Sequence, residues 1–259
     1  MKIGIKIFLF IGLVITLSLS LVIYSITFKS SAIVEKLALS AASKTAGECG
    51  NILKAEVEVA LNASRTLAQA LAGIKSRNIK LERETVIEML KRILEENPSF
   101  IGTYTCWEPE AFDGLDSSYI NKAGYDASGR FIPYVVKNKA GITIEPLVDY
   151  EVVGAGDYYL KSKKSKNEVI IEPYIYKIDG RDALITSVVA PIIINGVFTG
   201  IVGVDISIET LHEIISKIKP YETGYAYLVS NGGILASYPD GKYIGKNISS
   251  VIRACPIIS

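Results

Sequence analysis

An uninterrupted apolar run near the N-terminus sets the first constraint on this chain. Residues 7–28 read IFLFIGLVITLSLSLVIYSITF and contain no charged side chain. A helix needs about 20 apolar residues to cross a bilayer, so the run predicts a membrane-spanning helix. The alternative is a cleaved signal peptide, whose apolar region is usually about 7–15 residues long. The run here is longer and leads directly into a helical pattern, which favours a retained anchor.

The charges that flank this run predict its orientation. Lys2 and Lys6 precede it, and Lys29 follows it. Because the cytoplasmic flanks of membrane helices carry an excess of Lys and Arg, residues 1–6 are expected in the cytoplasm. The rest of the chain, up to Ser259, is then expected outside the membrane. This predicts a cell (inner) membrane protein with a single visible span.

Residues 29–82 predict a long stalk helix. No proline occurs before Pro98, and small or apolar residues recur alternately every four and three positions. Such spacing is typical of a coiled-coil seam or of a long packed helix. Two interpretations stay open: a seam that joins two copies in a homodimer, or a face that packs on its own domain, and a long helix has room for both. The seam positions are Leu53, Val57, Ala60, Ser64, Leu67, Leu71 and Ile74.

Residues 83–207 predict a short helix followed by a sheet. The helix is expected to end at Pro98, which cannot continue it. Short β-branched and aromatic runs follow, among them FIGTYTCWE and GVFTGIVGVDIS. The pairs Asp179-Gly180 and Asn195-Gly196 are hairpin signals, and strands joined by hairpins form an antiparallel sheet.

Residues 208–259 predict a linker helix and part of a second module. The helix is expected to stop at Pro220, after which GYAYLVSNGGILASYPDGKYIGKN repeats the strand-and-turn texture on a small scale. A strand pair and the start of a helix cannot bury a core. The second module is therefore expected to be truncated. The overall expectation is an α+β chain with two sheet-containing modules.

Charge and motifs argue against several classes of function. The net charge is +1, without the basic stripe that nucleic-acid binding requires. The spacing of Cys49, Cys106 and Cys255 fits no metal motif. The one histidine, His212, lies in the linker helix without an evident catalytic partner, and no phosphate-binding loop or nucleophile elbow is present. We therefore expect no enzyme activity, no metal, no cofactor and no nucleic-acid partner.

One stretch is unusually rich in tyrosines and carboxylates. Residues 129–177 contain six tyrosines, with Asp149, Asp157 and Glu172 among them, and Trp107 lies shortly before. Tyrosine rings form amphipathic walls that hold a cation by cation–π attraction, and carboxylates add a counter-charge. Tyrosine is also an ordinary strand residue. Composition alone leaves both interpretations open, a ligand lining and a sheet interior.

Six segments form an ordered set along the chain: WEPEAFDGLDSSY, DASGRFIPYVV, LVDYEVVGAGDYYL, EPYIYKIDGRDALITSVVAPI, GIVGVDIS and GYAYLVSNGGILASYPDGKYIGKN. In this order they resemble the double Cache sensor domain of bacterial methyl-accepting chemotaxis proteins. The resemblance covers about residues 30–259, and the anchor stands where that family has its first membrane span. The resemblance is less specific for the output module, because sensor histidine kinases and diguanylate cyclases carry the same sensor.

The resemblance implies a fold and a way of working. A long N-terminal helix lies along two PAS-like Cache modules with antiparallel sheets, a membrane-distal, ligand-binding module at 83–207 and a membrane-proximal one that is incomplete here. The family dimerises through the long helix and signals across the membrane to a cytoplasmic kinase pathway. The alternatives are the sensor of a membrane histidine kinase or cyclase, and an adhesive surface domain without a small ligand.

The resemblance also implies a ligand class. Amino-acid-sensing members carry an arginine that grips the ligand carboxylate, and Gly156 stands in its place here. They carry a late aspartate for the ligand ammonium, which Asp205 retains. The ligand expected is an amine or quaternary ammonium, with an amino acid as the alternative if Arg130 enters the pocket. The predicted ligand-binding residues are Trp107, Tyr134, Asp157, Tyr158, Tyr159, Tyr174, Tyr176 and Asp205.

Overall fold

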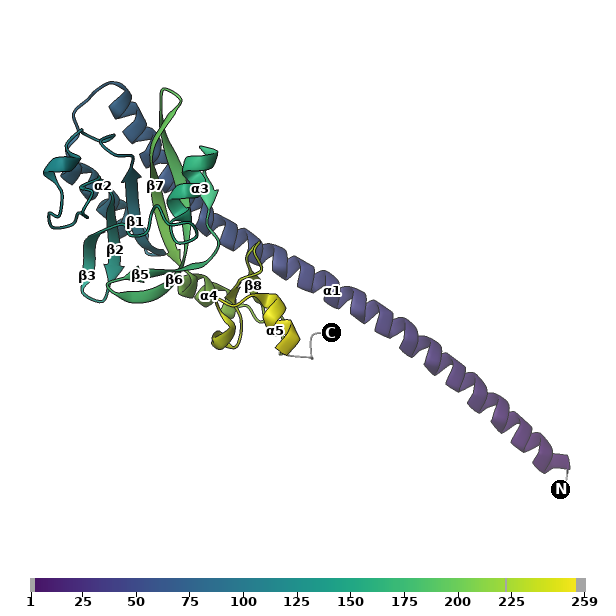
Figure 1. The fold of residues 1–259 in the computed structure, drawn as a ribbon. Coiled ribbons are helices and arrows are strands. Elements are labelled where there is room, and N and C mark those ends of the chain that lie inside the picture. The colour runs from purple at the N-terminus through teal and green to yellow at the C-terminus, as the bar shows by residue number, and fades with distance from the viewer. Residues whose placement is uncertain (1–2, 222, 255–259) are drawn as a thin grey trace. The chain divides into compact units, whose positions relative to one another are not determined.

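The computed structural model describes residues 3–221 and 223–254 of the chain. The chain divides into two compact units, residues 1–50 and residues 51–259. Helix α1, Ile3–Ser76, contributes to both (Figure 1). Lys2 and Cys255, which entered the sequence-based predictions, lie outside the described residues.

The first unit is helical and carries the predicted anchor. Its apolar window has a mean hydropathy of 2.6, and none of that window is buried inside the protein. By length and composition, this part of α1 suffices to cross a membrane.

An antiparallel sheet of seven strands organises the second unit (Figure 1). The strands follow the order β3-β2-β1-β7-β6-β4, and β5 also pairs with β6. All the pairings are antiparallel, which confirms the predicted α+β class. The strands are β1 Phe100–Trp107, β2 Pro133–Asn138, β3 Gly141–Pro146, β4 Val169–Ile170, β5 Tyr174–Ile178, β6 Arg181–Ile194 and β7 Val197–Ser207.

The two hairpins expected from the sequence connect β5 to β6 and β6 to β7. Asp179 and Gly180 have φ angles of 51° and 70°, and Asn195 and Gly196 have φ angles of 51° and 79°. Positive φ at both central residues matches the twist of the flanking strands, and Asn, Asp and Gly tolerate it. Local turn chemistry thus fixes the long β5–β6–β7 ribbon.

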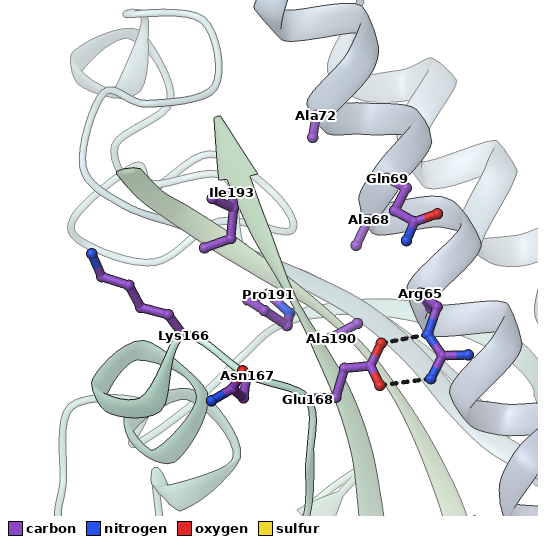
Figure 2. Close-up of a pocket in the computed structure, with 10 residues that line it drawn as sticks. All are labelled: Arg65, Ala68, Gln69, Ala72, Lys166, Asn167, Glu168, Ala190, Pro191 and Ile193. Carbon is purple, nitrogen blue, oxygen red and sulfur yellow. Dashed lines mark hydrogen bonds and ion pairs between the residues drawn. The ribbon is translucent and has the colours of Figure 1, made fainter. Parts of the chain in front are cut away.

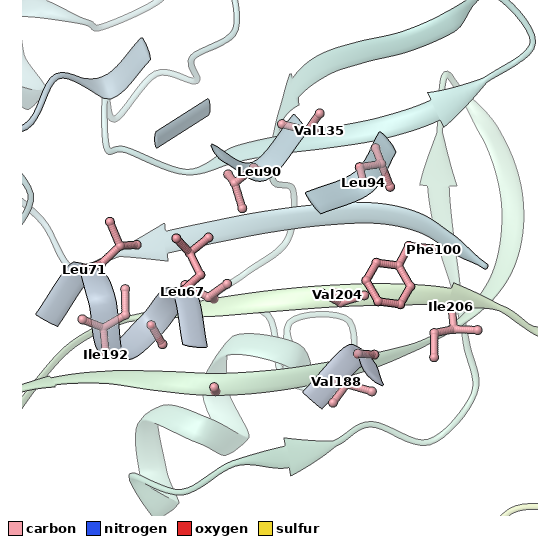
Figure 3. Close-up of a cluster of buried hydrophobic side chains, with 14 of the residues drawn as sticks. Leu67, Leu71, Leu90, Leu94, Phe100, Val135, Val188, Ile192, Val204 and Ile206 are labelled. Atoms are coloured by element: carbon pink, nitrogen blue, oxygen red, sulfur yellow. The ribbon is translucent and has the colours of Figure 1, made fainter. Parts of the chain in front are cut away.

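One face of the sheet is covered by the C-terminal part of α1 and by α2, Arg83–Glu96. Leucines of both helices interdigitate with strand residues in one hydrophobic cluster (Figure 3). The labelled members are Leu67, Leu71, Leu90, Leu94, Phe100, Val135, Val188, Ile192, Val204 and Ile206.

The seam of the stalk helix belongs to this core. Ala60, Ser64 and Leu71 are fully buried, and the Ser64 hydroxyl donates to the Val188 carbonyl oxygen at 3.1 Å. Of the two interpretations, packing on its own domain is therefore the one that holds for this half of the helix. The heptad-like spacing serves a helix-on-sheet contact here.

A buried arginine at the start of α2 fixes the loop between β1 and β2. Arg83 is 1% exposed and makes ion pairs with Asp113 at 2.8 Å and Asp116 at 2.7 Å. Its guanidinium also stacks over the Tyr119 ring at 4.0 Å. The loop includes the short 3-10 helix η1, Asp116–Ser118. Since its charge is fully paired, this cluster is a structural element.

After β7 the chain forms helix α4 and a small two-stranded sheet. Ser207 caps α4 by accepting the backbone N–H of Glu209 at 3.2 Å. His212 pairs through Nδ1 with the Ser237 hydroxyl at 2.9 Å, so it has a structural partner. The elements are α4 Ile208–Ser216, β8 Leu228–Val229, β9 Leu235–Ser237, the 3-10 helix η2 Gly241–Tyr243 and α5 Ile248–Ala254.

Candidate functional site

The other face of the sheet is covered by α3, Asp157–Ser165, and carries a tyrosine cluster. The rings pack mostly edge to face, with centroids 5.9 Å apart for Tyr104 and Tyr134 and 5.5 Å apart for Tyr134 and Tyr176. Such pairs stabilise beyond their buried area. We define the tyrosine cluster as Tyr104 on β1, Tyr134 on β2, Tyr158 on α3, and Tyr174 and Tyr176 on β5.

Strand register brings these side chains together with Asp205. Tyr104 lies opposite Tyr134, and Asp205 lies opposite both Gly102 and Ser187. Residues two apart on a strand share a face, so Tyr104 and Asp205 project from the same side of the sheet. A β-carbon on Gly102 would collide with the Tyr134 ring, and one on Gly203 with the Tyr104 ring. These glycines let the rings lie flat on the sheet.

Asp205 is a buried carboxyl without a cation beside it. It is 2% exposed, and the Ser187 hydroxyl donates to its Oδ1 at 2.6 Å. Within the described part of the chain, no Lys, Arg or His forms an ion pair with it. Burial raises the pKa of the Asp205 carboxyl to about 7, because desolvation outweighs the stabilisation from Ser187 and Tyr134.

Two hydroxyls of the cluster, those of Tyr104 and Tyr134, are buried and form no hydrogen bond within the described part of the chain. The Tyr104 hydroxyl lies close enough to Ser187 to affect its pKa, but without the geometry of a hydrogen bond. The Tyr134 hydroxyl approaches the Asp205 carboxyl closely enough to affect its pKa, but without the geometry of a hydrogen bond. Burial raises the pKa of both phenols well above the usual range, so they act as neutral donors and acceptors. Buried polar atoms are normally paired, so two unpaired hydroxyls beside a carboxyl without a counter-charge make this cluster a candidate for binding a polar ligand group.

The remaining cluster hydroxyls are engaged. The Tyr158 hydroxyl donates to the Val148 carbonyl oxygen at 2.6 Å, and the Val148 N–H donates to the Tyr176 hydroxyl at 3.1 Å. The Tyr174 hydroxyl pairs with the Ser187 hydroxyl at 2.8 Å. Two tyrosines thus tie the segment before α3 to the cluster, and the third joins the Asp205 network.

Arg130 points inward and contacts Tyr159. It is 4% exposed, and its Nη2 donates to the Tyr159 hydroxyl at 3.1 Å and to the Trp107 carbonyl oxygen at 2.7 Å. Its Nη1 pairs with Glu151 at 2.8 Å. The Tyr159 hydroxyl also contacts Glu108 and Lys163. Arg130 therefore points into the interior, which an amino-acid ligand would require. Its guanidinium is, however, already held by protein acceptors.

The structure brings most of the predicted residues together and separates others. One face of the sheet carries Tyr134, Tyr174, Tyr176 and Asp205, and Tyr158 packs against that face from α3. Tyr159 lies next to this group, and its ring is 6.0 Å from that of Phe198.

Two predicted residues lie elsewhere. Trp107 belongs to the core on the opposite face, where its ring packs 5.0 Å from Phe112. Asp157 lies near the surface at the start of α3 and pairs with Lys161 at 3.0 Å. Trp107 therefore faces away from the tyrosine cluster, so its prediction as a ligand-binding residue together with these tyrosines is wrong.

Tyr104 and Ser187 lie at the candidate site but were not among the predicted ligand-binding residues. Tyr104 alternates with Cys106 on one face of β1, and both belong to the cluster on that face. The strand period of two could have found Tyr104, because it shares a parity with the buried Cys106. Ser187 gave no sequence signal of its own.

A second candidate is a cavity of about 490 Å³ between α1 and β6 (Figure 2). Across it, Arg65 and Glu168 form a bidentate ion pair, with N–O distances of 2.5 and 2.6 Å. Both side chains are partly exposed, and their charges satisfy each other. The cavity lacks the unpaired buried groups that mark the tyrosine cluster, so the cluster is the stronger candidate.

Metal chemistry finds no support in the described residues. Within 3–221 and 223–254, no three His, Cys, Asp or Glu side chains are grouped to hold a metal ion. Cys49 and Cys106 are free thiols, and burial raises the pKa of Cys106 to about 12. A thiol with so high a pKa is a poor nucleophile at neutral pH.

The fold matches a known class of sensor. A family model described as methyl-accepting chemotaxis protein-like, first PDC sensor domain, matches residues 86–213. The extracellular domain of mmHK1S-Z2, a protein described as a histidine kinase, is 40% identical with a TM-score of 0.72, and the match covers 81% of this chain and 76% of that one. The chain belongs to the PDC, or Cache, sensor domains of methyl-accepting chemotaxis proteins and related receptors.

Two further relatives carry chemotaxis names. The solved structure of methyl-accepting chemotaxis protein X is 28% identical with a TM-score of 0.63, and the match covers 87% of this chain and 83% of that one. TlpQ, a methyl-accepting chemotaxis protein of Pseudomonas aeruginosa, is 26% identical over 183 residues, which are 64% of this chain and 26% of TlpQ. The chain thus spans about a quarter or less of the curated relatives it matches.

Proposed function

We propose that this chain is the extracytoplasmic sensor region of a transmembrane chemoreceptor and that it binds a small cationic molecule at the tyrosine cluster. One observation carries the proposal. Asp205 is a buried carboxyl that no protein cation neutralises in the described part of the chain, and five tyrosines surround it. A positively charged ligand would complete this site.

The energetics favour an ammonium group. Burying an unpaired carboxylate is costly, and the raised pKa of Asp205 is the sign of that cost. A ligand ammonium restores the missing counter-charge, and a charge-assisted hydrogen bond contributes about 1.5–3 kcal/mol.

The carboxylate of an α-amino acid ligand would find no free partner among these side chains. Gly156 provides no side chain for a ligand carboxylate, and Arg130 is held by the Trp107 carbonyl oxygen and Glu151. A ligand carboxylate buried here would lack a free partner. An amino acid stays the alternative ligand, and it would require Arg130 to exchange these contacts.

Titration calorimetry on the chain in lipid nanodiscs tests the ligand class. Propylamine and 2-aminobutyrate form a matched pair that differs by one carboxylate. We expect propylamine to bind and the added carboxylate to bring no gain. Tight binding of 2-aminobutyrate without binding of propylamine would refute the proposal and point to Arg130.

Substitutions separate the two carboxylates. Asp205→Asn keeps the shape and removes the counter-charge, so propylamine affinity should fall about 10- to 150-fold. Asp157→Asn is the matched control, because Asp157 lies near the surface and pairs with Lys161. A solvated charge contributes little, so its change should leave the affinity nearly unaltered.

The output of the whole protein is a separate part of the proposal. The match to TlpQ supports a chemoreceptor, and the match to mmHK1S-Z2 favours a histidine kinase as the second candidate. For the chemoreceptor we propose signalling through a cytoplasmic kinase pathway. Incubating the full-length protein with labelled ATP decides between them. A chemoreceptor leaves the protein unlabelled and needs an added kinase, whereas a histidine kinase labels itself.

We also propose that two copies assemble as a homodimer in the membrane. The stalk carries the support, because residues 29–50 of α1 continue directly from the predicted span. Cross-linking through single cysteines placed along residues 30–45 tests this. Cross-links with a helical periodicity support a dimer, and uniform absence of cross-links contradicts it.

A further inference from the structure

The unpaired hydroxyls of Tyr104 and Tyr134 affect which kind of cation the site can accept. Each is nine-tenths buried or more, and each lies on the same face of the sheet as Asp205. A neutral phenol can accept one hydrogen bond and donate another. A cationic ligand group bound here would therefore meet three oxygen groups: the Asp205 carboxylate and the hydroxyls of Tyr104 and Tyr134.

Two kinds of cation would use these groups differently. A primary ammonium has N–H donors for the carboxylate and for both phenol oxygens. A quaternary ammonium has no N–H, so both hydroxyls would stay unpaired inside the protein, and the ligand would forgo a gain in affinity of about fivefold or more from each missing hydrogen bond. Hydrogen-bonding sites that are left unpaired in this way are a strong source of discrimination.

The packing of the tyrosine rings also favours a primary ammonium over a quaternary one. A cage for a quaternary ammonium needs free ring faces around the methyl groups. Here the rings occupy one another edge to face, at centroid distances of 5.6 Å for Tyr104–Tyr158 and 6.0 Å for Tyr158–Tyr176. The rings of Tyr104 and Tyr134 also lie against the sheet at Gly203 and Gly102.

We propose that the tyrosine cluster selects primary ammonium groups over quaternary ones, with Asp205, Tyr104 and Tyr134 each accepting one N–H of the ligand. This inference rests on the proposed function, since it concerns the same site. Tyr104 and Tyr134 then determine specificity, and Asp205 supplies the charge.

Two probes of equal chain length test the inference in nanodiscs at pH 8: butylamine and butyltrimethylammonium. We expect butylamine to bind at least about tenfold more tightly. Tyr104→Phe and Tyr134→Phe remove one acceptor each and keep the ring, so each should weaken butylamine binding by about fivefold or more and leave the quaternary probe unchanged. Tyr227→Phe is the control, because Tyr227 is half exposed and lies outside the cluster.

The outcomes separate this inference from the proposed function. Equal or tighter binding of butyltrimethylammonium overturns the selectivity and leaves a cation site in place. Phe variants that weaken both probes equally overturn the roles of the two hydroxyls. If neither probe binds to the wild-type chain, the proposed function fails as well.

Discussion

Replacing Asp205 with asparagine should stabilise the free protein at alkaline pH while it weakens ligand binding. The wild-type carboxyl is buried without a cation, and its pKa is raised from 3.8 to about 7. Between these two values the folded state keeps a proton that the unfolded state has lost. Stability therefore falls as the pH rises through this window, because the unfolded state binds fewer protons than the folded state.

The magnitude follows from the shift. Each pKa unit corresponds to about 1.36 kcal/mol, so a shift of about three units costs the wild type on the order of 4 kcal/mol above pH 7. Asparagine carries no charge and has nearly the same shape, and its amide oxygen can accept the hydrogen bond from Ser187. We expect Asp205→Asn to be about 2–4 kcal/mol more stable at pH 8 and little different at pH 4.

Urea unfolding in nanodiscs measures this difference. The single tryptophan, Trp107, is fully buried in the core on the helix side of the sheet, so its fluorescence reports unfolding of the sensor domain. Curves at pH 4, 6 and 8 give the slope of stability against pH for wild type and variant. A variant that is less stable at pH 8, or one with the same pH slope as wild type, would show that Asp205 is not a strained buried carboxyl.

Three further predictions concern the core, the floor of the site and Arg130. Leu71→Ala should lower the free energy of unfolding by about 2–5 kcal/mol, because Leu71 is fully buried, while exposed Val59→Ala changes it by about 0.5 kcal/mol or less; equal effects in urea unfolding would place the seam outside the core. Gly203→Ala should displace the Tyr104 ring and lower both the melting temperature and the butylamine affinity, whereas Gly73→Ala, in open space on α1, should lower neither. If Gly203→Ala leaves both quantities unchanged, the Tyr104 ring is free to move. Arg130→Met should destabilise the fold and leave the preference for propylamine over 2-aminobutyrate intact, and a calorimetric change in that preference would assign Arg130 to the ligand.

Local signals in the sequence predicted the connections of the sheet well. Asp179-Gly180 and Asn195-Gly196 set positive φ angles by themselves, so the hairpins needed no tertiary information. The spacing on α1 predicted a buried stripe, but periodicity cannot say what covers it. A coiled-coil partner and the domain's own sheet both require apolar residues at the same spacing.

The sequence predicted which residue types form the candidate site, but it predicted less well the face to which each side chain projects. Trp107 and Tyr104 are three positions apart on β1, so their side chains project to opposite faces, and a grouping by composition overlooked this. Tyr158 and Tyr159 are neighbours on a helix, so one faces the cluster and the other faces Arg130. The inward turn of Arg130 depends on the Trp107 carbonyl and Glu151, which only the tertiary structure brings near.

Proton release on ligand binding tests the central claim most directly. Asp205 has a pKa of about 7, so about three quarters of the molecules carry its proton at pH 6.5, and an ammonium ligand must displace it. Calorimetry of butylamine binding at pH 6.5, in two buffers with different ionisation enthalpies, counts the protons released. We predict about 0.75 proton per ligand for wild type and close to zero for Asp205→Asn. Butylamine binding without proton release in the wild type, or with equal release in the variant, would contradict a site in which Asp205 receives the cation.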